Sequence, residues 1–353
     1  MTINYQVLEE YVNKLVVNHI PKAEKVSVIK DDTLLPKATG SSIIHISNQS
    51  ITLLLLYACF AKDNKLFKRL LFYYYWTCRN LSELKIQTAA HCFHKMIETI
   101  QDKGNRMYGY AQSVQYNLLC FFVLGHEACH TCFSQNESFK QSSIDDAMLF
   151  LNDVFKDTSD LNNKIIEKIT KQVMAEINGN RFSDEKEEYA CDILSIRFLM
   201  NKGLAGVEIS EDQYKDISQQ LLDMTMMLQY DNNMQRLREG VFKWSSYKTY
   251  MSGHLRLSVF RIANVAYTLQ EVLEERNVDI SSLLRESILK GQKSLSGLRT
   301  FNLLDLGGAI GTDEDICEDF DKIAFMKEHL NQTSDYINSL LLGEDLSIYE
   351  NME

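Results

Sequence analysis

Two histidines and a glutamate in the run His126-Glu127-Ala128-Cys129-His130 are the residues best suited to chemistry in this chain. On a helix, residues four apart lie one turn above each other, so both imidazoles project from one face, as two ligands of a tetrahedral zinc ion must. Glu127 lies about 100° further round the helix, where it cannot join those ligands but can reach a water bound to the metal. The spacing predicts one zinc ion per chain with Glu127 as general base, against the alternative of a helix with two ordinary histidines.

A catalytic zinc site needs a third protein ligand and an open fourth position for water. Glu188 and Asp192 are four apart in a second helix, expected over residues 184–202. Glu188 can bind zinc through a carboxylate oxygen, and Asp192 can accept a hydrogen bond from the far nitrogen of a zinc-bound histidine, which fixes the ring direction. Glu187 is the alternative ligand, and a cluster of acidic residues that favours the helix N-terminus is the competing interpretation.

HExxH followed some tens of residues later by ExxxD resembles the gluzincin metallopeptidases, and within them the HtpX-type and Lit-type phage-exclusion peptidases. Residues 36–54 are similar to the turn, strand and helix start that precede the metal helix in those enzymes. His254 and Arg261 are similar to a later His-Pro…Arg-Ile motif, although Leu255 replaces the proline and Arg261 falls one position late.

This resemblance implies a zincin-like core and a zinc-dependent endopeptidase that hydrolyses peptide bonds by metal-activated water, with a protein or peptide as substrate. The peptide would add to the edge of a strand at residues 42–47. His254 is the first candidate for the donor that stabilises the oxyanion, followed by Tyr247, Tyr250 and Arg261. A narrow-specificity toxin or a phage-defence protease is the expected role, and the sequence identifies no regulatory partner or inhibitor.

Other interpretations compete with a peptidase. Glu127 and His130 also form ExxH, a carboxylate-bridged iron motif, but the chain has no second ExxH. A non-catalytic, metal-binding helical interaction protein is the main alternative. Two weaker candidates are a thiol role for the CxxC of Cys129 and Cys132, and a metal site made of His91, His94 and Glu98.

The elements that must position these residues are mostly helices. The chain has only 2 prolines, Pro21 and Pro36, so long helices are permitted after position 36. Two β-branched runs, at 25–30 and 42–47, predict a small N-terminal β-hairpin or sheet. The fold class is therefore mainly α (α+β). Helices are predicted over 4–19, 49–61, 64–79, 81–101, 108–134, 143–156, 160–178, 184–202, 211–230, 253–275, 279–292 and 317–342.

The whole chain, 353 residues long, is expected to form a metallopeptidase domain over 1–302 with helical insertions, then an acidic loop and C-terminal helix over 303–353. A net charge of −11 without a Lys/Arg-rich stripe argues against a nucleic-acid partner. The apolar runs at 51–61 and 118–124 are shorter than the roughly 18–20 residues that span a bilayer. With scattered cysteines and no signal peptide, a soluble cytoplasmic protein is expected.

Overall fold

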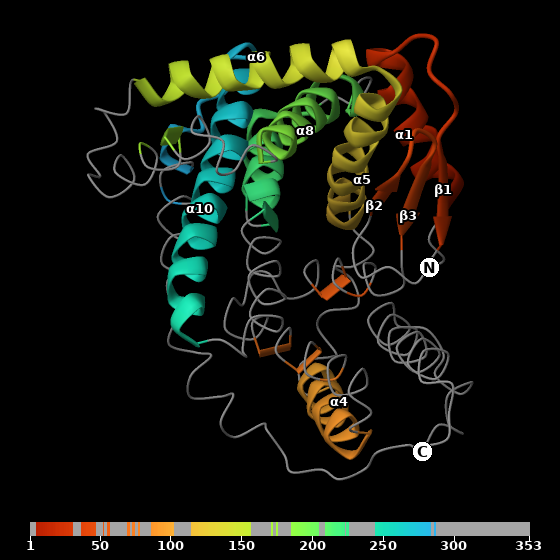
Figure 1. Cartoon of the computed structure of the whole chain (residues 1–353), viewed down its shortest axis with the longest axis vertical. Coiled ribbons are helices and arrows are strands. Elements are labelled where there is room, and N and C mark those ends of the chain that lie inside the picture. Colours follow the sequence, from red (N-terminus) through yellow and green to blue (C-terminus); the bar gives the residue numbers. More distant parts are fainter. Residues whose placement is uncertain are drawn as a thin grey trace.

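A computed structural model of the chain describes residues 5–30, 37–46, 86–101, 114–156, 185–204, 209–222 and 244–283, with isolated residues elsewhere (Figure 1). Side chains in the first half of the last long helix and at a few other helix ends lie outside this description. The described residues are mainly helical with one small sheet, which confirms the predicted mainly α (α+β) class, whereas the zincin-like core stays a prediction. The predicted segment 303–353, most of 49–79 and most of 160–178 and 284–292 lie outside the described residues.

The sheet has three short strands in the order β1-β3-β2. The strands β1 (Ser27–Lys30) and β3 (Ile43–Ile46) are parallel, and β2 (Lys37–Thr39) pairs antiparallel with β3. Gly40, at a φ of 63°, supplies the left-handed residue that the turn from β2 to β3 requires. β2 was not predicted, because three residues carry too little periodicity to be recognised.

The predicted substrate edge at residues 42–47 is wrong. β3 forms the middle of the sheet and pairs on one side with β1 and on the other with β2, so its backbone offers no edge for a peptide. β2 is the edge strand on the side of α5 (Val114–Gln135), the helix that carries HExxH. Any peptide that extends this sheet at the candidate site must therefore pair with β2.

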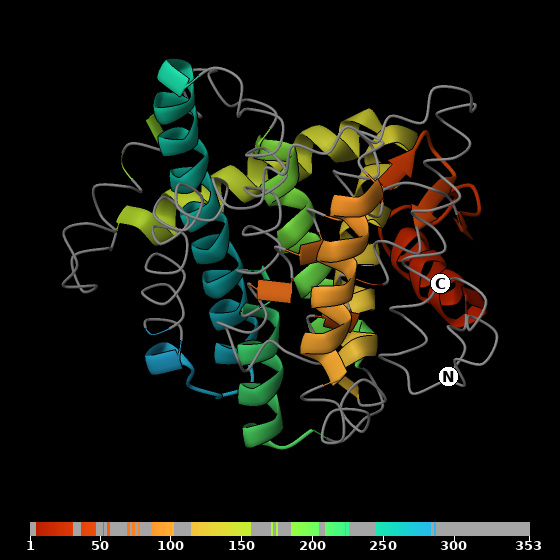
Figure 2. The same ribbon diagram turned by 90° about the horizontal axis from the view of Figure 1, so that it is seen from below.

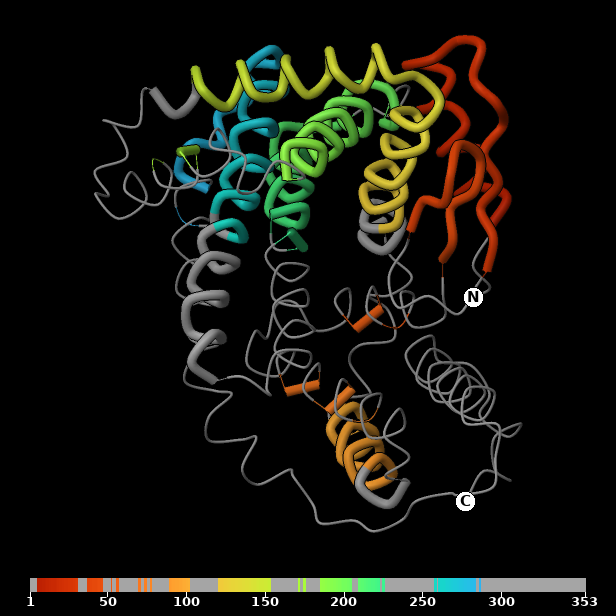
Figure 3. Tube along the Cα trace, viewed as in Figure 1, coloured from red at the N-terminus to blue at the C-terminus, as the bar shows by residue number. Residues whose placement is uncertain are grey.

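Helix α5 is the central element of the fold. It packs against α1 (Tyr5–His19) and the strands on one side and against α8 (Glu185–Phe198) on the other, and Figure 3 traces α1 and the strands together beside α5. Helix α8 lies between α5 and α10 (Trp244–Glu274), as the view from below shows (Figure 2). Helix α6 (Glu137–Lys156) lies across α5 and α8 (Figure 1), and α4 spans Ile86–Gln101.

Several predicted helix boundaries are corrected by local structure. Helix α6 begins at Glu137 rather than at 143, because the Asn136 side chain accepts a hydrogen bond from the Phe139 backbone N–H at 3.0 Å and caps the helix. Helix α8 ends at Phe198 and continues as one π-helical segment, η3 (Leu199–Gly203). Helix α10 starts nine residues before the predicted 253. In the described part of the chain, no helix is both long and apolar enough to cross a membrane.

Gly125 allows α5 and α8 to approach closely just before HExxH. A Cβ atom at this position would lie 2.5 Å from Ser195 Oγ on α8 and 3.4 Å from the Tyr11 hydroxyl on α1. Ser195 Oγ instead donates a hydrogen bond to the Phe122 carbonyl at 2.9 Å. The glycine thus sets the distance between the two helices that carry the predicted metal ligands.

Candidate metal centre

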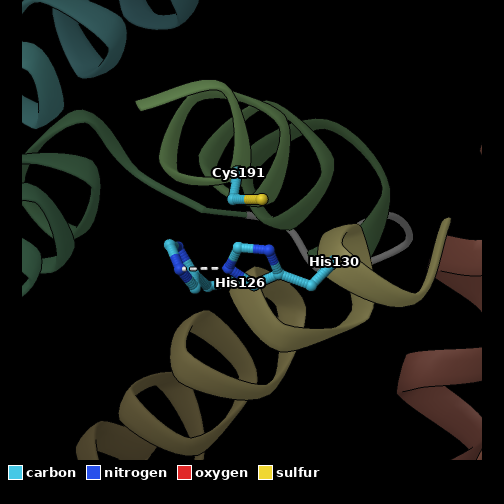
Figure 4. A group of neighbouring side chains, drawn as sticks. All are labelled: His126, His130 and Cys191. Carbon is cyan, nitrogen blue, oxygen red and sulfur yellow. Dashed lines mark hydrogen bonds between the residues drawn. The ribbon is translucent and has the colours of Figure 1, made fainter. Parts of the chain in front are cut away.

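The candidate site lies where α5 meets the first half of α8. His126 and His130 project from consecutive turns of α5, and Cys191 extends toward them from α8 (Figure 4). The His126 side chain is 9% exposed and that of His130 is 20% exposed. The helical spacing therefore has the effect predicted from the sequence: both rings lie on one face, and that face is turned to the acidic turn of α8.

Side-chain atoms of the three predicted ligands converge. His126 Nε2 and His130 Nε2 lie 3.2 Å apart, Glu188 Oε2 lies 3.2 Å from His126 Nε2, and Glu188 Oε1 lies 3.4 Å from His130 Nε2. In a tetrahedral site with zinc bonds of about 2.0–2.1 Å, ligand atoms lie about 3.3–3.4 Å from one another. Each of the three distances is near this value, and the two contacts of Glu188 are made by different oxygens of its carboxylate.

Cys191 is a further candidate ligand that the sequence analysis did not identify. Its sulfur and one nitrogen of each histidine all lie within 4.8 Å of one another, and this buried group could hold a metal ion. The signal was present in the spacing, since Cys191 follows Glu188 by three residues and shares its helix face. Burial raises the pKa of the Cys191 thiol well above its ordinary value, and a hydrogen bond with Cys129 raises it further. A metal binds the thiolate, so binding through Cys191 would release the thiol proton.

Two carboxylates hold the outer nitrogens of the imidazoles. His126 Nδ1 lies 2.8 Å from Asp192 Oδ1, the contact predicted for Asp192, and His130 Nδ1 lies 2.8 Å from Glu187 Oε1. Since a carboxylate accepts, each Nδ1–H donates, and once the ring is neutral its Nε2 lone pair is available to a metal. Glu187, which the sequence offered only as an alternative ligand, thus orients His130, and Lys140 Nζ on α6 lies 2.6 Å from its other oxygen.

Arg261 on α10 contacts the carboxylates behind the site. Its Nε donates to Asp192 Oδ2 at 2.7 Å, its Nη2 donates to Asp192 Oδ1 at 3.0 Å, and its Nη1 lies 3.3 Å from Glu188 Oε2. Burial raises the pKa of Asp192, but the positive charges of Arg261 and His126 outweigh that effect and leave the pKa below its usual value. The guanidinium therefore keeps Asp192 charged, and the predicted role of Arg261 as an oxyanion donor stays a prediction.

Glu127 is positioned by the sheet. Its Oε2 accepts a hydrogen bond from the Ala38 backbone N–H of β2 at 2.7 Å. Burial raises the pKa of Glu127, and the charges of His126 and His130, with the Ala38 bond, only partly lower it. A carboxylate with a raised pKa is a stronger base near neutral pH, as proton transfer from water requires.

The remaining predicted residues divide into two groups. His254, Tyr247 and Tyr250 lie on α10, but their side chains are outside the described residues. The face of α4 proposed as a second metal site is exposed and paired internally: His94 Nε2 lies 3.2 Å from Glu98 Oε1, and Lys95 Nζ lies 2.8 Å from Glu98 Oε2.

Cys129 and Cys132 are free, buried thiols, and burial raises the pKa of Cys132 well above its ordinary value. A raised thiol pKa disfavours the reactive thiolate, so the CxxC offers no support for a redox role.

No protein-family model, curated protein or solved structure matches the chain. The gluzincin resemblance therefore stays a prediction that rests on the residues themselves.

Proposed function

We propose that this chain is a zinc-dependent endopeptidase of gluzincin type with a zincin-like core, one zinc ion per chain and the ligands His126, His130 and Glu188. The observation that carries the proposal is the convergence of the two Nε2 atoms, 3.2 Å apart, with the Glu188 carboxylate, whose Oε2 lies 3.2 Å from His126 Nε2 and whose Oε1 lies 3.4 Å from His130 Nε2. Both Nδ1 atoms are bonded to carboxylates, which supports metal binding through Nε2.

Zinc bound to these ligands would supply Lewis-acid polarisation of the scissile carbonyl and lower the pKa of a bound water. Glu127 would accept the proton of the attacking water and pass it to the leaving amine. Three protein ligands leave a fourth position for water and substrate, which favours catalysis over a purely structural site. His254 remains the proposed donor to the oxyanion.

One observation favours the non-catalytic alternative. If the Cys191 sulfur bound together with His126, His130 and Glu188, the ion would have four protein ligands, as structural zinc sites do. Replacing zinc with cobalt distinguishes a site in which Cys191 is a ligand from a site in which it is not, because the two differ in their sulfur-to-cobalt absorption. A peptidase with Glu188 as third ligand should show no sulfur-to-cobalt charge-transfer band. A strong band that the Cys191→Ser variant loses would favour the structural site.

The decisive experiment compares the wild type with Glu127→Gln. The variant should keep one zinc per chain and lose about 10²–10⁴-fold in peptide hydrolysis, the range that general base catalysis contributes. Mapping of new protein termini after expression of both forms would identify the substrate. Glu275→Gln, the same change at an exposed position of the chain, is the matched control and should retain full activity. Undiminished cleavage by zinc-loaded Glu127→Gln would refute the mechanism.

As biological role we propose a narrow-specificity toxin or phage-defence protease that acts in the cytoplasm. An unrestricted protease would degrade the proteins of its own cell, so the pure enzyme should act on few substrates or be latent. Incubation with casein tests this expectation. Rapid and general degradation of casein would contradict it, while leaving the zinc site itself unaffected.

A further inference from the structure

The hydrogen bond between β2 and Glu127 is donated by a backbone N–H that faces away from the neighbouring strand, that of Ala38. In an antiparallel pair, successive residues alternate between those that exchange hydrogen bonds with the partner strand and those whose N–H and C=O point away from it. Ala38 lies opposite Ile44 of β3, yet its N–H donates to Glu127 Oε2 at 2.7 Å. Ala38 is therefore the outward-facing residue of β2, and the outer edge of the sheet faces the candidate base.

The neighbours of Ala38 cannot take over this contact. Lys37 and Thr39 lie opposite His45 and Ile43, at the alternate positions where backbone groups face β3. A three-residue edge strand thus presents one central N–H to the site. Glu127 is directed to that N–H, on the side of α5 that contacts β2.

A general base must hold one carboxylate oxygen in a fixed direction. The glutamate side chain has three rotatable torsions, and a misplacement of about 1 Å costs up to about 10²-fold in rate. A hydrogen bond to Oε2 fixes the plane of the carboxylate and leaves Oε1 for the proton.

We propose that the backbone N–H of Ala38 is a positioning group for Glu127, which ties the catalytic base to the edge strand along which a peptide would lie. This inference rests on the proposed peptidase function. The contact is not the only hydrogen-bonded link between α5 and the sheet region in the described part of the chain. The far end of α5 is held separately, because Gln135 accepts a hydrogen bond from the Glu24 N–H at 2.9 Å and donates to the Ser41 carbonyl.

Ala38→Pro tests the proposal, because proline has no N–H. Proline is tolerated on an edge strand where the N–H does not face the partner strand. The variant should keep its zinc and lose about 10- to 100-fold in kcat on the mapped peptide substrate. Ala38→Gly, which keeps the N–H, and Gln135→Ala, which loosens the sheet elsewhere, should keep kcat within about threefold. A proline variant with the kcat of the glycine variant would overturn the proposal.

Hydrogen exchange of the Ala38 amide provides a second measurement that needs no activity and no proline. The amide should be protected in the wild type and in Glu127→Gln, whose side-chain oxygen still accepts, and should exchange at least about tenfold faster in Glu127→Ala. Equal exchange in the wild type and Glu127→Ala would overturn the positioning role. If the Ala38 amide is protected from exchange but the zinc-loaded chain cleaves no peptide, the proposed function is overturned. The positioning of Glu127 by Ala38 is then unaffected.

Discussion

At the scale of single residues, each imidazole of the centre is oriented by a different carboxylate. Asp192 is 1% exposed and bonded to Arg261, whereas Glu187 is 28% exposed and bonded to Lys140. The two supports therefore differ in environment although both lie 2.8 Å from an Nδ1 atom. Glu187 is the better position for mutation, because a change at a half-buried side chain disturbs the core least.

We predict that Glu187→Gln weakens zinc binding by about 10- to 100-fold, the usual cost of losing a carboxylate that supports a ligating histidine. A neutral amide accepts the Nδ1 hydrogen bond more weakly and lowers the basicity of the ring. Competition with a chelator measures the affinity, and Glu275→Gln serves as the control. Unchanged zinc affinity in Glu187→Gln would show that this contact does not tune the site.

Zinc binding should also depend on pH in a defined direction. Without metal the pKa of His126 is raised from 6.5 to about 10: burial lowers it, but bonds to Asp192 and Glu188 raise it more. The imidazolium therefore stabilises the metal-free fold fully below pH 6.5, and this stabilisation is lost as the pH rises through about 10. Zinc must displace that proton, so affinity should increase over the same range.

The measurement is the rise in Tm on adding zinc, recorded at several pH values across this range. The rise should be larger at about pH 8 than at about pH 6, and proton release should accompany binding. His130 should act in the same direction, since its pKa is also raised: burial lowers it, and the bond to Glu188 raises it more. A zinc-induced shift that does not change with pH would contradict this prediction.

At the scale of elements, the approach of α5 to α8 controls the centre. Gly125→Ala would place a methyl group 2.5 Å from Ser195 Oγ. We predict a loss of about 1–3 kcal/mol in the free energy of unfolding, the usual cost of overpacking. Ser195→Ala removes the obstructing oxygen, so the double variant should lose less than the sum of the two single variants. Denaturant unfolding of all four proteins measures this coupling, and strictly additive losses would rule out the clash.

Helix periodicity explains why much of this centre could be predicted from the sequence. Four-residue spacing fixes His126 above His130 and Glu188 above Asp192 in any regular helix. The spacing does not fix the rotation of α8 about its own axis relative to α5, which is set by contacts such as Gly125 with Ser195. The separate roles of Glu187 and Glu188 follow from that rotation and were not predictable. The spacing places Cys191 on the face of Glu188, but its approach to the histidines also depends on the rotation.

The sheet was predictable only in part, for a related reason. The β-branched runs of β1 and β3 are visible in the sequence, but the pairing order depends on β2, which has just three residues. The contact of Ala38 with Glu127 joins residues 89 positions apart and involves a backbone N–H, for which no side-chain pattern exists. Long-range backbone contacts of this kind require the folded structure.

At the scale of the whole molecule, α10 is joined to α8 by two arginines in different environments. Arg261 is 16% exposed and pairs with the buried Asp192, whereas Arg197 is 34% exposed and forms two bonds with Glu271, at 2.9 and 2.7 Å. A buried carboxylate that loses its partner is costly, and an exposed pair contributes little.

We therefore predict that Arg261→Met destabilises the chain by about 3–5 kcal/mol, the cost of breaking a buried pair. Arg197→Met should cost about 1 kcal/mol or less, because its ion pair is partly exposed. Thermal or denaturant unfolding of the zinc-free proteins measures both values. Equal losses in the free energy of unfolding of the two variants would show that Arg261 only links α10 to α8 and does not balance the charge of Asp192.

The residues of the candidate metal centre come from segments that the ribosome synthesises at different times. Asp192 is 66 residues beyond His126, and Arg261 is 135 residues beyond it. A nascent chain that has emerged only as far as α8 carries every proposed ligand, but Asp192 still lacks its cationic partner. Charge balance at the metal centre is completed only when α10 emerges and docks. An incomplete translation product should therefore hold the His126 imidazole less firmly than the full chain does, because Asp192 orients that ring.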